Sequence, residues 1–241
     1  VHTIAPKDEH THYLHSAGCI HHNVYMDSRG ANPLKDMALI AELAVLYHKV
    51  KPDIILHYTI KPNVYGAMAA ALVGRPCINN VCGLGTVFLK KGLVSAIAKV
   101  LYKFSFRFPK KVFFQNPDDL ELFIDQMLVD PMKTDLLPGS GIDLEKFQPQ
   151  AFHRNTTFTF LTISRLIYDK GIVEYIEAIK ILRARGLRAK FQLLGATDPV
   201  HTRGIPIAML NQWIEEGWIE YLGKTDDVRP YIHAADCVVL P

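Results

Sequence analysis

The sequence predicts an α/β fold made of two domains, each built on a mostly parallel sheet. Short apolar runs alternate with stretches of helical periodicity along the chain, a pattern typical of βαβ units. A polar, turn-rich interval interrupts this alternation after residue 138, and the pattern starts again beyond residue 155. The chain has 241 residues and is 49% hydrophobic, which is enough to form two moderate cores.

The first predicted domain covers residues 1–138. Its apolar runs are four to six residues long and are rich in β-branched and aromatic side chains, as strands are. The strands are expected at His2–Ala5, Ile20–Tyr25, Asp53–His57, Cys77–Val81, Val112–Gln115 and Thr134–Leu137. The helices are expected at Pro33–Lys49, Asn63–Val73, Gly92–Phe106 and Asp118–Met127.

Residues 139–155 are predicted to link this domain to a second one, which covers residues 156–241. Pro138, Gly139, Gly141 and Pro149 make the interval rich in turn-forming residues, as inter-domain connections are. The second domain is expected to have strands at Phe158–Ile163, Lys190–Leu194, Ile219–Leu222 and Cys237–Leu240, with helices at Val173–Arg185, Pro206–Glu216 and Val228–Ala235.

The composition favours a folded protein of a reducing compartment, so we expect it in the cytoplasm. No apolar run reaches the ~18 residues that a membrane-spanning helix needs, and the chain does not open on a pattern typical of a secretory leader. The four cysteines show neither zinc-type pairing nor dense disulfide spacing, and are expected to be small interior groups: Cys19, Cys77, Cys82 and Cys237.

Positive charge is concentrated in one part of the first domain. The formal net charge is only +3, but no acidic residue lies between Asp53 and Asp118, an interval that holds many lysines and arginines. Within it, residues 88–111 have apolar positions at helical spacing alongside cations that include Lys99, Lys103 and Arg107. Such a helix suits the surface of an anionic membrane, and the alternative is an ordinary amphipathic helix with a solvated basic face. No nucleic-acid-binding motif accompanies these cations, so a nucleic-acid partner is not expected.

Two cations flank the strand-to-helix turn "TISRLIYDKG", residues 162–171. Arg165 offers a planar fork of donors and Lys170 a point charge, and backbone amides become available where the next helix begins. This combination suits a diphosphate. The alternative is that both residues are solvated loop cations, with Asp169 as a partner.

Two other patterns are not expected to carry a cofactor. Five histidines occur early in the chain without a carboxylate or thiol at convincing ligand spacing, so a loop is favoured over a metal site at His10, His12, His15, His21 and His22. Gly139-Ser140-Gly141 is only a fragment of a dinucleotide-binding fingerprint. Neither a metal nor NAD is therefore expected.

Four segments together resemble the retaining glycosyltransferases of family 4. They are "LPGSGIDLEKFQP" (137–149), "SRLIYDKG" (164–171), "FQLLG" (191–195) and "IEYLGKTDDVRPYIHAADCVVLP" (219–241), in the family's order. The resemblance implies a GT-B fold, in which two Rossmann-like domains face a cleft. It implies that Arg165, Lys170 and Gly171 hold the donor diphosphate, and that Gly195, Leu222 and Gly223 border the nucleotide. Asp143 lies in the hinge signature, where a turn or helix cap is its expected role.

The first half resembles a subgroup of bacterial galactosaminyltransferases that extend undecaprenyl-diphosphate-linked sugars. The segments that carry this resemblance are residues 57–88 and "LYKFSFRF", residues 101–108. It implies that the acceptor side of the cleft is formed by Thr59, Lys61 and Asn63 together with Gly83 and Gly85. His57 ends a predicted strand facing the cleft and is the candidate catalytic contact to the transferring sugar; a packed or solvated histidine is the alternative.

The resemblance also implies that both domains are incomplete. Val1 begins in what resembles the family's second strand, and the family's acidic motif would follow Pro241. The expected function is transfer of an N-acetylhexosamine from a UDP-sugar to a lipid-linked glycan at the inner face of the cell membrane, without a metal. Two alternatives stay open: an inactive nucleotide- or membrane-binding fragment, and a nucleotide-sugar epimerase of the same fold.

Overall fold

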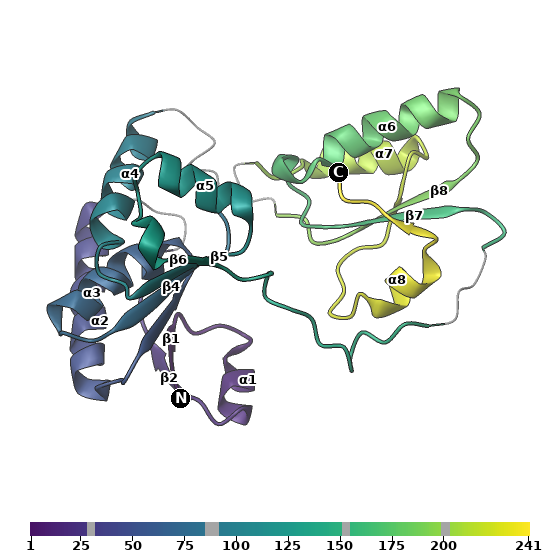
Figure 1. The fold of residues 1–241 in the computed structure, drawn as a ribbon. Coiled ribbons are helices and arrows are strands. Elements are labelled where there is room, and N and C mark those ends of the chain that lie inside the picture. Colours follow the sequence, from purple (N-terminus) through teal and green to yellow (C-terminus); the bar gives the residue numbers. More distant parts are fainter. Residues whose placement is uncertain (28–31, 85–91, 151–154, 199–202) are drawn as a thin grey trace. The chain divides into compact units, whose positions relative to one another are not determined.

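The structure, a computed structural model, describes residues 1–27, 32–84, 92–150, 155–198 and 203–241 (Figure 1). The chain divides into two compact units, Val1–Gly141 (unit 1) and Ile142–Pro241 (unit 2), and the division lies inside the predicted linker. Every strand ladder in both units is parallel, which confirms the predicted fold class.

The strands of unit 1 form two sheets. β1 (His2–Ala5) and β2 (Ile20–Asn23) pair only with each other. A four-stranded sheet has the order β3 (Ile55–Tyr58), β4 (Cys77–Val81), β5 (Lys111–Phe114), β6 (Thr134–Leu136). All six predicted strands are therefore present, with ends that differ by a few residues, but the sequence pattern did not show that they would form two sheets.

Two helices of unit 1 begin directly after a capping asparagine. The side chain of Asn32 accepts hydrogen bonds from the amides of Leu34 and Lys35, and that of Asn116 accepts one from Asp119, with a proline directly after each cap. The helices are α1 (Thr11–Ser16), α2 (Pro33–Val50), α3 (Ala67–Leu72), α4 (Leu93–Ser105) and α5 (Pro117–Asp125), with the π-helix η1 (Pro62–Gly66) before α3 and the 3₁₀ helix η2 (Pro131–Lys133) before β6.

The prediction of a loop around the early histidines is wrong for His12 and His15, because both lie in α1. The start of α1 is organised by Asp8, whose carboxylate accepts hydrogen bonds from the amide of His10 and the hydroxyl of Thr11. A six-residue helix is too short to show a hydrophobic period, so the sequence pattern did not reveal it.

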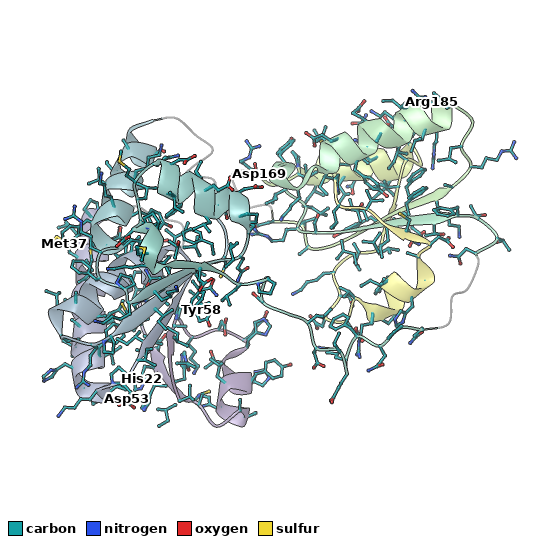
Figure 2. The ribbon with its side chains drawn as sticks, in the orientation of Figure 1. His22, Met37, Asp53, Tyr58, Asp169 and Arg185 are labelled. Atoms are coloured by element: carbon teal, nitrogen blue, oxygen red, sulfur yellow. The ribbon has the colours of Figure 1, made fainter. Side chains whose placement is uncertain are left out.

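Helices cover one face of the four-stranded sheet of unit 1. One core cluster joins α2 and α3 to Ile55 and Cys77, and a second joins α4 and α5 to Val112 and Phe114. The alternate residues of β3 point to the other face, where Leu56 and Tyr58 are exposed; Figure 2 labels Tyr58 at the end of this strand. The sheet is therefore closely packed on its helix-covered face, and its other face is exposed at Leu56 and Tyr58.

Unit 2 has a single sheet with helices on both faces. The strand order is β10 (Cys237–Val238), β7 (Thr159–Ile163), β8 (Lys190–Leu194), β9 (Glu220–Tyr221). The helices are α6 (Ile172–Ala184), preceded by the 3₁₀ helix η3 (Tyr168–Lys170), α7 (Ile207–Glu215) and α8 (Arg229–Ala234). Figure 1 shows α6 and α7 on one face of the sheet and α8 on the other. The core lies between β8 and the helices α6 and α7, and includes Ile176, Leu193 and Trp213.

Candidate functional site

The turn that carries Arg165 and Lys170 is held by its apolar residues. Leu166 and Ile167 are buried, and the amide of Leu166 donates to the carbonyl of Ala196 at 3.0 Å. The neighbouring Arg165 therefore points outward and is exposed, as is Lys170. The sequence placed both cations at the carboxyl end of β7, and the structure does the same.

Asp169 does not use either cation as its partner. Its carboxylate lies 2.7 Å from Nε of Arg203 (Figure 2 labels Asp169), and the amide of Tyr168 donates to the Arg203 carbonyl. Within the residues that the structure describes, neither Arg165 nor Lys170 has a salt bridge. Both charges are available to an anion, which removes the Asp169 pairing from the alternatives.

Gly171 connects this turn to α6. Its φ of +67° lies in the left-handed region, and a Cβ built on it would come within 2.8 Å of the backbone of Pro241. Its carbonyl accepts from the amide of Tyr175, so the amides of the first turn of α6 have no partner within the helix. Oxygen atoms of an anion suit such amides.

Gly195 brings the ends of three strands together. A Cβ built on it would lie 1.8 Å from the carbonyl oxygen of Ser164, so only glycine allows β7 and β8 to end so close to each other. The amide of Gly195 donates to the carbonyl of Gly223 at 2.8 Å, and the hydroxyl of Tyr221 donates to the Gly195 carbonyl. The amide of Leu222 donates to the carbonyl of Leu193. The predicted nucleotide-side residues Gly195, Leu222 and Gly223 are thus adjacent at one edge of the sheet, close to the turn after β7.

His57 lies in the interior of unit 1, where its side chain is only 3% exposed. Its Nδ1 is 2.9 Å from Oδ1 of Asn79 and its Nε2 is 3.1 Å from the hydroxyl of Tyr47. The side-chain nitrogen Nδ2 of Asn79 donates to the carbonyl of Asn63, which identifies Oδ1 of Asn79 as the acceptor for Nδ1–H of His57. Nε2 of His57 therefore carries no proton and accepts from the hydroxyl of Tyr47. Burial lowers the pKa of His57 to about 4.

The catalytic role expected of His57 is therefore corrected, because both ring nitrogens are already hydrogen-bonded inside the unit. The alternative of a packed histidine describes it. β3 alternates between a buried and an exposed face, and His57 shares the buried face with Ile55, toward α2 and η1. A built Cβ on Gly66 would lie 2.6 Å from Nε2, which shows how closely η1 packs on the ring. Tyr47 and Asn79 were not among the expected functional residues; the two polar residues inside the strand "CINNV" are the signal that could have indicated the network.

The predicted acceptor-side loop, Thr59 to Asn63, is strained and firmly attached. Thr59 has a φ of +66°, which is rare for a β-branched residue. Asn63 is buried, and its side chain donates to the carbonyl of Asn80 at 2.8 Å. The π-helix that begins at Pro62 is a feature often found at functional sites.

Lys61 is held by α2 and does not extend freely. Its Nζ lies 2.6 Å from one carboxylate oxygen of Asp36, and the other oxygen accepts from the hydroxyl of Tyr65 at 2.8 Å. Gly83 follows β4 and is exposed, and no atom lies within 4 Å of a Cβ built on it. Gly85, the remaining predicted acceptor-side residue, lies outside the described residues.

The predicted membrane-contacting cations lie on or next to α4. Lys103 and Arg107 are exposed, and Lys99 is half-buried. No helix in the described ranges is long and apolar enough to cross a bilayer. In the same ranges, no three histidine, cysteine or acidic side chains come together as a set of metal ligands.

Two family models match the chain. Residues 1–116 match the model described as "Glycosyl transferase 4-like", and residues 157–241 match "Glycosyl transferases group 1". The two matches fall one in each structural unit and between them cover most of the chain.

Two curated relatives agree with these models. The chain is 28% identical to the N,N'-diacetylbacillosaminyl-diphospho-undecaprenol alpha-1,3-N-acetylgalactosaminyltransferase of Campylobacter jejuni, with 100% of this chain and 66% of the relative covered. It is 27% identical to the UDP-Gal:alpha-D-GlcNAc-diphosphoundecaprenol alpha-1,3-galactosyltransferase of Escherichia coli, with 88% and 58% covered. The chain thus spans about two thirds or less of the length of these relatives.

A solved structure supports the fold. The crystal structure of Alr3699/HepE from Anabaena, in complex with UDP and glucose, matches with a TM-score of 0.71 at 17% identity, covering 98% of this chain and 65% of that one. Each unit has parallel strands and helices, and each matches a glycosyltransferase family model. Together these features define the class of glycosyltransferases with the GT-B fold. In sequence, both units of the chain are similar to glycosyltransferases, unit 1 to the 4-like model and unit 2 to the group 1 model.

Proposed function

We propose that this chain is part of a retaining glycosyltransferase that moves an N-acetylhexosamine from a UDP-sugar to a lipid-linked glycan acceptor in surface polysaccharide biosynthesis. Arg165, Lys170 and the first amides of α6 hold the diphosphate of the donor, and Gly195, Leu222 and Gly223 border its nucleotide. Stabilising the diphosphate as it leaves favours the transfer step. The reaction requires no metal or cofactor.

The observation that carries this proposal is the pair of exposed cations beside an open helix start. Arg165 and Lys170 have no salt bridge within the described residues, whereas the nearby Asp169 is held by Arg203. Charges left free at the carboxyl ends of parallel strands mark the edge where such sheets bind ligands. The names of both curated relatives specify diphosphoundecaprenol-linked acceptors, and one specifies a UDP-sugar donor.

The acceptor is proposed to approach unit 1 through the Thr59–Asn63 loop and the turn that contains Gly83 and Gly85. Because such an acceptor is embedded in a bilayer, the protein is proposed to work at the cytoplasmic face of the membrane as a peripheral protein. Lys99, Lys103 and Arg107 provide attraction to anionic headgroups, at about 1 kcal/mol for each cation that reaches the surface. Nucleic acid is not a partner in this proposal.

The transferase is favoured over both alternatives. The two relatives are named as transferases and neither as an epimerase. The epimerase would also need catalytic carboxylates, and Asp169, the acidic residue inside the cation-bearing turn, is already paired with Arg203. An inert fragment would not need to keep two free cations beside Gly171.

Titration calorimetry with UDP tests the proposal. Arg165→Ala and Lys170→Ala should each weaken binding by roughly 1–3 kcal/mol, because each removes a charge-assisted contact to a phosphate oxygen. Arg185→Ala is the matched control: this arginine is also exposed but lies at the other end of α6, as Figure 2 shows. Unchanged affinity in both test variants, or an equal loss in the control, would remove the diphosphate role.

A further inference from the structure

α4 has two apolar faces, and only one of them is buried. Tyr102 and Phe106 are at most 2% exposed and pack against Phe123 of α5, with ring centroids 5.1 and 5.7 Å from the Phe123 ring. Ser105 is buried on the same face. This face fixes α4 to the sheet and needs no further partner.

The second apolar face points to solvent. Its exposed fractions are 51% for Ile97, 67% for Val100, 49% for Phe104 and 36% for Phe108. The spacing of three, four and four residues places these side chains in one row along α4 and the turn after it. We call them the apolar row. Folded proteins rarely leave a contiguous row of large apolar side chains in water without a binding partner.

The two phenylalanines of the apolar row hold each other in place. Their rings lie 5.3 Å apart at an interplanar angle of 87°, an edge-to-face arrangement. They therefore form one projecting aromatic group, which presents its surface without first losing much side-chain freedom.

Positive charge lies beside the apolar row. Lys103 and Arg107 are exposed and come directly before Phe104 and Phe108 in the sequence. Within the described residues neither of them has a salt bridge, so no carboxylate neutralises either charge. A row of apolar side chains flanked by uncompensated cations is complementary to an anionic lipid surface, where headgroup charge overlies an apolar interior.

We propose that the apolar row inserts into the acyl boundary of an anionic membrane and is the main anchor of the protein, with Lys103 and Arg107 remaining among the headgroups. This rests on the peripheral membrane binding proposed above. It adds that burial of Ile97, Val100, Phe104 and Phe108 holds the protein after charge has attracted it. Binding that depended on cations alone would be lost when salt shortens the screening length from ~10 Å to ~3 Å.

Sedimentation with vesicles tests the anchor. The wild-type chain should bind vesicles of phosphatidylglycerol and phosphatidylcholine, and part of that binding should survive 1 M salt. The double variant Phe104→Ser and Phe108→Ser should lower the vesicle partition coefficient at least tenfold, both at low salt and in 1 M salt. Its affinity for UDP should not change. Ile181→Ser is the control: its side chain is 53% exposed on α6 of unit 2, and vesicle binding should not respond to it.

A second measurement reads insertion directly. Phe104→Trp should be quenched by lipids brominated on their acyl chains, and Ile181→Trp should not, relative to the shared background of Trp213 and Trp218. Equal quenching in the two variants would overturn the proposal, as would a double phenylalanine variant that sediments like wild type. Either result leaves charge-driven membrane binding standing, so it separates the anchor from the proposal on which it rests.

Two further outcomes also count against the anchor. If the wild-type chain binds neither anionic nor neutral vesicles, membrane binding fails as a whole, while the UDP titration still decides the nucleotide site. If the wild type is a dimer in solution and the double phenylalanine variant is a monomer, the apolar row joins two copies of the chain instead.

Discussion

The strand ends of unit 1 and of unit 2 use polar residues in opposite ways. At β3 and β4, His57, Asn79 and Asn63 hydrogen-bond to one another or to nearby backbone inside the unit. At β7, the buried Leu166 and Ile167 hold the turn, and Arg165 and Lys170 are left exposed. Polar groups that are already hydrogen-bonded fix the shape of a loop, whereas exposed unpaired cations can bind a ligand.

This difference assigns separate tasks to the two regions. The network around His57 positions the loop that begins at Thr59, and the strained φ of that residue needs such support. The glycines of unit 2 let three strand ends approach one another so that the cations and helix-start amides share one edge. An exposed and unpaired cation at a strand end is therefore the stronger candidate for direct contact with an anionic ligand.

The largest expected effect comes from adding a side chain at the joined strand ends of unit 2. In Gly195→Ala the new Cβ would meet the carbonyl oxygen of Ser164 at 1.8 Å, and that oxygen belongs to the backbone and cannot rotate away. We expect unit 2 to lose at least about 4 kcal/mol of stability and UDP binding to be abolished. Both tryptophans lie in unit 2, so urea unfolding followed by tryptophan fluorescence measures the loss.

Gly186→Ala is the matched control for this change. Gly186 also has a positive φ, +87°, but no atom lies within 4 Å of its built Cβ. Only the cost of the left-handed backbone remains, about 1–2 kcal/mol. If the two alanine variants proved equally stable, close approach of Ser164 would not be the reason that residue 195 is glycine.

The second expected effect is a pH dependence that belongs to unit 1. Burial lowers the pKa of His57 from 6.5 to about 4, so between these values the unfolded chain takes up a proton that the folded chain does not. The free energy of unfolding of unit 1 should therefore fall by up to about 3 kcal/mol as the pH drops from 6.5 to 4. Far-UV circular dichroism during urea titration at several pH values measures this loss.

His57→Gln provides the comparison for that measurement. Glutamine retains hydrogen-bonding capacity but does not titrate, so the variant should be less stable at pH 7 and should lack this part of the pH dependence. The tryptophan signal of unit 2 serves as an internal reference in the same samples. A variant with the wild-type slope between pH 6.5 and pH 4 would show that another group causes the loss.

The sequence was most informative where structure is local and least informative where distant segments meet. Short apolar runs located the strands, and helical periodicity located helices such as α2. The positions of Arg165 and Lys170 followed from the strand-to-helix pattern alone. The partners of His57 and Lys61, by contrast, are separated from them by 10 to 25 residues, so only the packed structure shows that these side chains are paired.

The smallest expected effect tests whether the cations of unit 2 are free before the nucleotide arrives. Asp169 is paired with Arg203, with 29% and 46% of the two side chains exposed, so Asp169→Asn should change stability by less than about 1 kcal/mol. UDP affinity should also rise less than tenfold, because the substitution removes a nearby screened charge but releases neither Arg165 nor Lys170. Calorimetry with UDP, with Glu177→Gln as a control for an exposed acidic residue of α6, measures this change. A gain of tenfold or more would mean that Asp169 competes with the nucleotide for these cations, and the contrast between the two strand ends would then be one of degree.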